Sequence, residues 1–172
     1  MNRIRILIIQ ALNPSYGSGG WAEQAKLGIR VQGGSRTPDD RIVDGLQKAK
    51  VLSAIDTLPK IQGAWLRYGY GPQALFDKRE IVRHLLARPY KADAAEKWLE
   101  LADVAVDDAR TRITSEGGGI IPPVDIYWMR MGITRQSFAE TWASRRSDML
   151  DMLQGIDTAA LSGVAKNIRK TA

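Results

Sequence analysis

The chain has 172 residues, which suits one domain or one domain with a small appendage, and its 44% hydrophobic residues are enough for a packed core. Its net charge of +6 favours polyanions such as nucleic acids as partners. It contains no cysteine, which excludes disulfides, thiolate metal sites and cysteine nucleophiles.

Residues 1–36 are interpreted as an N-terminal arm with a short helix. Ile4 to Leu12 predicts a short strand or hydrophobic arm, and its apolar run is too short for a signal peptide or a membrane span. Turn residues follow from Asn13 to Gly20, and Trp21 to Leu27 predicts a short helix. We therefore expect a soluble cytoplasmic protein that does not enter a membrane.

Residues 37–114 are predicted to form a helical core, so that the fold is mainly α. One helix starts at Thr37-Pro38 and runs to about Leu58, and the next covers Ile61–Tyr68. Two more are expected over Asp77–Arg88 and Asp93–Ile113. The longer of these two carries an apolar stripe at helical spacing, formed by Trp98, Leu101, Ala105 and Ala109.

Side chains that could carry catalysis are scarce. His84 is the only histidine, which excludes zinc sites built from several histidines, and no nucleophile-elbow motif accompanies it. Asp103, Asp107 and Asp108 lie on one predicted helix, and we interpret them as its solvated face. A magnesium-dependent recombination nuclease that uses these aspartates stays open as an alternative. The main expectation is a protein without enzymatic activity, cofactor or bound metal.

Residues 120–172 are predicted to form a helix-turn-helix-like lobe with a basic tail. A helix over 122–132 ends at Gly132, and a second over 133–143 has Thr134 as a plausible cap. A third over 144–155 is closed by Gly155, and a final helix covers 157–172. Two short helices joined by a tight turn after a supporting helix form a helix-turn-helix layout.

The third helix is the predicted recognition helix, and its exposed N-terminal end is predicted to contact DNA. Phe138, Ala139 and Trp142 are expected to be the buried face of the middle helix, and Met149 and Met152 that of the third. The turn before Ser144 lacks the glycine and branched apolar residue usual in DNA-binding motifs, so a plain three-helix packing motif stays open. The predicted DNA-contacting residues are Arg135, Gln136, Ser144, Arg145, Arg146, Ser147, Lys166, Arg169 and Lys170.

The order of several short motifs resembles the small antiterminator Q proteins of lambdoid phages and prophages. Trp21 to Gly28 matches their Trp-Gly/Ala-x-x-Ala-x-x-Gly element, and Pro38-Asp39-Asp40 matches the segment that opens their Leu/Val-rich helix. Leu66 to Gly71 matches a Leu-x-Tyr-x-Tyr-Gly ending, and Phe138 to Leu153 takes the place of a helix-turn-helix that resembles region 4 of sigma factors. In the compact members no segment like residues 73–121 intervenes.

This resemblance implies a transcription factor that promotes read-through of terminators. It implies binding to a promoter-proximal element of double-stranded DNA and to bacterial RNA polymerase with its sigma factor. A non-catalytic helical adaptor whose basic charge is incidental is the other alternative.

Overall fold

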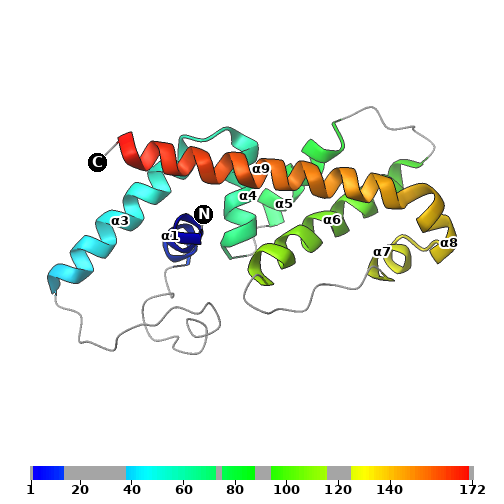
Figure 1. Ribbon diagram of the computed structural model, residues 1–172, viewed down its shortest axis with the longest axis horizontal. Coiled ribbons are helices and arrows are strands. Elements are labelled where there is room, and N and C mark those ends of the chain that lie inside the picture. Colours follow the sequence, from blue (N-terminus) through cyan, green and yellow to red (C-terminus); the bar gives the residue numbers. More distant parts are fainter. Residues whose placement is uncertain (1, 14–37, 73–74, 88–93, 116–124, 171–172) are drawn as a thin grey trace.

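The computed structural model describes residues 2–13, 38–72, 75–87, 94–115 and 125–170, and in these ranges the chain is helical without a strand (Figure 1). The predicted mainly α fold is confirmed. The short helix predicted at Trp21–Leu27 lies outside the described residues. The elements are α1 (Asn2–Leu12), α3 (Pro38–Asp56), α4 (Lys60–Tyr70), α5 (Leu75–Leu85), α6 (Ala95–Ser115), α7 (Asp125–Arg130), α8 (Arg135–Ser137), the π-helical turn η2 (Phe138–Trp142) and α9 (Ala143–Lys170).

The 28-residue helix α9 organises the molecule. It runs along the long axis in Figure 1, and it packs against α1, α3, α4 and α6. Its buried side chains recur every three or four residues, the spacing that places them on one face of a helix. They are Met149, Leu153, Asp157, Ala160, Leu161 and Val164.

The helix end predicted at Gly155 is wrong, because α9 continues without interruption to Lys170. The predicted third and final helices are therefore two halves of one element. A glycine inside a helix costs about 1 kcal/mol relative to alanine. Leu153 and Asp157, on either side of Gly155, are buried, and their packing offsets the cost of the glycine.

The strand predicted for Ile4 to Leu12 is also wrong, since these residues form α1. Ile4, Leu7, Ile8 and Ala11 follow helical rather than alternating spacing, and Ile8 is fully buried. The helix packs against α3, α4 and α9. The apolar side chains on one face of α1 are buried against these three helices, and this burial makes the helix more stable than an extended conformation.

Packing crosses the boundary expected between the core and the C-terminal lobe. The stripe predicted on α6 is confirmed, with Trp98, Leu101, Ala105 and Ala109 all buried. These side chains belong to one hydrophobic cluster together with buried residues of α1, α4, α7 and α9. None of the described helices is both long and apolar enough to cross a membrane.

Candidate nucleic-acid interface

The turn between α7 and α8 is closed by hydrogen bonds at both of its ends. Gly132 takes φ 60°, the left-handed conformation that glycine adopts without steric cost. The amide of Ile133 donates to the Trp128 carbonyl at 3.1 Å, and that of Gly132 donates to the Met129 carbonyl at 3.2 Å. This pair of bonds is a Schellman motif, which ends α7 and fixes the direction in which the chain leaves it.

The next helix starts directly after this turn. Thr134 caps it, since its Oγ1 accepts a hydrogen bond from the Ser137 amide at 3.1 Å, which confirms the predicted cap. From Arg135 onward the chain stays helical through α8, η2 and α9, so the break predicted near Ser144 is wrong. The only tight turn within residues 125–170 is therefore the one at Gly132.

The first two turns of this helix have a buried and an exposed side. Phe138 and Trp142 are buried as predicted, whereas Ala139 is exposed, contrary to the prediction. The π-helical geometry of η2 changes the rotation per residue, and π-turns are common at functional sites. The exposed side chains are Thr134, Arg135, Gln136, Ala139, Glu140, Thr141 and Ser144.

Arg145 is held between two tryptophan rings. Its guanidinium carbon lies 4.8 Å from the ring centroids of both Trp98 and Trp142. Those two rings also meet edge to face, with centroids 5.2 Å apart. Cation–π contacts with two rings join α6 to the start of α9 and occupy the side chain within the protein.

Arg146 is engaged in a buried network centred on Asp108. Its Nη2 lies 3.1 Å from the Asp108 carboxylate, and its guanidinium lies 4.4 Å from the Tyr127 ring centroid. Asp108 also accepts hydrogen bonds from Arg112 at 2.9 Å and from the Tyr127 hydroxyl at 2.5 Å. Only 1% of the Asp108 side chain is exposed, so its interpretation as part of a solvated face is wrong.

The electrostatics of this network favour a charged carboxylate. Burial by itself would raise the pKa of Asp108, but hydrogen bonds from Arg112, Tyr127 and Arg146 hold that pKa below its usual range. Burial and the hydrogen bond to Asp108 raise the pKa of Tyr127. The network thus ties α6, α7 and α9 together through an ionised Asp108 and a neutral Tyr127.

The other two aspartates of α6 are also paired. Lys78 of α5 lies 2.6 Å from Asp103 and 3.0 Å from Asp107, and the Tyr68 hydroxyl donates to Asp107 at 2.5 Å. Within the described part of the chain, no group of three potential ligands could hold a metal ion. These carboxylates connect α4, α5 and α6.

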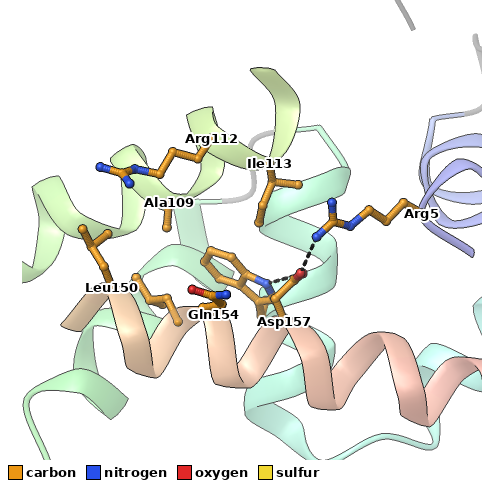
Figure 2. Close-up of a pocket in the computed structure, with 9 residues that line it drawn as sticks. Arg5, Ala109, Arg112, Ile113, Leu150, Gln154 and Asp157 are labelled. Atoms are coloured by element: carbon orange, nitrogen blue, oxygen red, sulfur yellow. Dashed lines mark hydrogen bonds and ion pairs between the residues drawn. The ribbon is translucent and has the colours of Figure 1, made fainter. Parts of the chain in front are cut away.

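A second buried carboxylate, Asp157, lines a cavity of about 240 Å³ between α1, α4, α6 and α9. It accepts hydrogen bonds from Arg5 at 3.1 Å, from Trp65 Nε1 at 3.0 Å and from the Tyr70 hydroxyl at 2.7 Å. Figure 2 shows Arg5 reaching Asp157 from α1, while Arg112 extends from α6 away from that carboxylate. The polar groups at this cavity hold α1 in place.

The remaining predicted DNA-contacting residues fall into two separate groups. Ser144 and Ser147 are exposed on the first turns of α9, near Arg135 and Gln136 in the chain. The basic tail, made of Lys166, Arg169 and Lys170, is exposed at the other end of the helix. About 33 Å of helix separates Ser144 from Lys166. The structure does not bring these two groups together.

The sequence was compared with models of protein families, with curated proteins and with solved structures. A model for phage antitermination protein Q matches residues 45–172, which is well over half of the chain. The chain belongs to the phage antitermination protein Q family. No match was found among curated proteins or among solved structures.

Membership of the antitermination Q family confirms the resemblance predicted from the sequence. Proteins of this family act as phage antiterminators, which are regulatory rather than typically catalytic. The matched residues include α4 to α9, with the turn at Gly132, whereas α1 lies outside the match.

The helix end at Gly132 and the cap at Thr134 are correctly predicted from the sequence, but the tight turn of a helix-turn-helix is placed before Ser144, where the chain is helical. Gly132-Ile133 is a glycine followed by a branched apolar residue, the pair that was missing before Ser144. The contacts of Arg145 and Arg146 gave no signal in the sequence, because their partners Trp98, Tyr127 and Asp108 are distant in the chain.

Proposed function

We propose that this antiterminator binds a promoter-proximal DNA element through the helix that starts at Thr134, and that it binds RNA polymerase to promote read-through of terminators. Family membership and the net charge of +6 support this role. The observation that carries the DNA part is the closed turn at Gly132, which is followed by a capped helix with an exposed polar start.

Arg135 and Gln136 are the side chains that we assign to base recognition. In helix-turn-helix proteins the first residues of the second helix contact base edges in the major groove. Arginine pairs with guanine and glutamine with adenine through two hydrogen bonds each. Gln136 Nε2 donates to Glu140 Oε1 at 2.8 Å, which orients the amide before DNA arrives.

Arg145 and Arg146 receive a different role in this proposal. Their contacts with Trp98, Trp142 and Asp108 hold the start of α9 against α6, so they position the recognition helix. Ser144, Ser147 and the basic tail stay as candidates for phosphate contacts, since all of them are exposed.

The nuclease alternative has less support. Asp103 and Asp107 share Lys78, and Asp108 is enclosed by two arginines, which leaves little open carboxylate for magnesium. Membership of a family of regulatory proteins also favours DNA binding over DNA cleavage as the role of this protein.

Competition binding at fixed salt tests the DNA assignment. A specific duplex is first selected from random sequences, and each variant is then titrated against that duplex and a scrambled one. Arg135→Ala and Gln136→Ala should each lose about 1–3 kcal/mol of discrimination. The control variant, Arg169→Ala with Lys170→Ala, should weaken both duplexes about equally.

Two results would count against the assignment. Unchanged discrimination in both recognition-helix variants would place the DNA reader elsewhere in the chain. For the antitermination role, transcription with purified RNA polymerase should show greater terminator read-through when the protein is added, and an unchanged read-through would refute that role.

A further inference from the structure

A groove beside α6 and α7 lies outside the proposed DNA interface. Its volume is about 540 Å³, and it is formed by side chains that recur on one face of α6 together with one from α7. The lining residues are Glu96, Leu99, Glu100, Asp103, Val104 and Arg130.

One large apolar side chain is exposed in this groove. Leu99, which lines the groove, is 51% exposed. The floor is apolar as well, since Val104 is buried. A concave site with an apolar centre and a polar rim matches the composition of protein–protein interfaces.

The charge of the groove is opposite to that of the chain as a whole. Asp103 is paired with Lys78 and Arg130 lies 3.6 Å from Asp107, so these charges are largely balanced. Glu96 and Glu100 have no cationic partner among the residues that the structure describes. In a chain of net charge +6, this local excess of carboxylates repels nucleic acid and attracts a basic protein segment.

The groove is also fixed relative to the proposed DNA reader. Lys97, which lies between the groove residues of α6, donates a hydrogen bond to the Met131 carbonyl at the end of α7. α6 also packs against α7, and α7 leads through the closed turn into the recognition helix. A partner bound in the groove would therefore be held in a defined orientation to the DNA.

We infer that this groove docks a basic, amphipathic segment of RNA polymerase, one that carries lysine or arginine beside an apolar side chain. The inference rests on the proposed function, which names RNA polymerase as a partner. The carboxylates of Glu96 and Glu100 would pair with the basic groups, and Leu99 and Val104 would cover the apolar side chain.

Three variants test this docking surface. The first reverses two charges, Glu96→Lys with Glu100→Lys, and the second, Leu99→Ser, removes apolar area without changing charge. The control is Asp148→Lys with Asp151→Lys, which makes the same charge change at two exposed positions of α9. Thermal denaturation is used to confirm that all three variants fold like the unaltered protein.

The measurement is the affinity of each labelled protein for purified bacterial RNA polymerase holoenzyme in the absence of DNA. Both groove variants should bind at least about tenfold more weakly than the unaltered protein. The control should stay within about threefold, because its charges lie outside the groove.

The outcomes separate this inference from the proposed DNA binding. Equal polymerase binding by the groove variants and the control, or no polymerase binding by the unaltered protein, would overturn the inference. Self-association in sedimentation that the groove variants abolish would also overturn it, because the occupant would then be a second copy. Loss of DNA discrimination in the Arg135 and Gln136 variants is measured separately and does not depend on the groove.

Discussion

Replacing Asp108 by asparagine should destabilise the protein more than most single substitutions do. Asn keeps the shape of the side chain but removes the charge that Arg112 and Arg146 share. The Tyr127 hydroxyl can still donate to the amide oxygen. The substitution therefore tests the charge of the network rather than its packing.

The size of the effect follows from how well water can replace the lost carboxylate. The Arg112 side chain is 45% exposed and can be solvated, whereas that of Arg146 is only 16% exposed. Leaving one member of a buried ion pair without its partner costs about 3–5 kcal/mol. Because only one of the two arginines is strongly enclosed, we expect the lower end, about 3 kcal/mol.

Urea denaturation followed by circular dichroism measures this change in the free energy of unfolding, and thermal denaturation measures the accompanying change in Tm. For a chain of this size, about 3 kcal/mol corresponds to a fall in Tm of about 6–12 °C. Asp148→Asn, at an exposed position of α9, is the matched control and should change the free energy of unfolding by less than about 0.5 kcal/mol. A loss below about 1 kcal/mol for Asp108→Asn would refute the reasoning.

The same network predicts a dependence on pH. The pKa of Asp108 is lower in the folded protein than its unfolded value of about 3.9. Its contribution is therefore complete above about pH 5 and is lost as the pH falls through the folded pKa. The stability difference between the unaltered protein and Asp108→Asn should shrink below about pH 4, and a difference that grows there would contradict the sign of the pKa shift.

Three further substitutions test other parts of the fold through the free energy of unfolding. Trp142→Ala removes a 6% exposed ring that packs against Trp98 and should cost about 3–5 kcal/mol; a loss under about 1 kcal/mol would contradict its place in the core. Gly155→Ala should stabilise the protein by about 0.5–1 kcal/mol, because a Cβ there meets nothing within 4 Å, and destabilisation would show that α9 is interrupted. Thr134→Ala removes the cap of the recognition helix and should cost about 1 kcal/mol; no loss would mean that the Ser137 amide finds another partner.

Much of the helical core could be predicted because its signals are local. Pro38 opens α3 as expected, and the apolar stripe of α6 follows directly from residue spacing. The cap at Thr134 and the glycine at 132 also depend only on their immediate neighbours. Such features are decided within a few residues along the chain.

The failed predictions concern features that tertiary packing decides. Gly155 looks like a helix end locally, but the core stripe on both sides keeps α9 continuous. Arg145 and Arg146 look like exposed cations at the start of a helix, yet Trp98 and Asp108 lie 47 and 38 positions away in the sequence. No pattern within a short window contains both partners.

The ion pair between Arg5 and Asp157 has a consequence for biosynthesis. The two residues are 152 positions apart, and they join α1 to α9. At about 5–20 residues per second, the ribosome adds Asp157 roughly 8–30 s after Arg5. During that interval the apolar face of α1 has no α9 to pack against, and Asp157 itself remains inside the ribosome for a further period. The packing of α1 is therefore completed only after α9 has been synthesised, and until then α1 can pack only against α3 and α4.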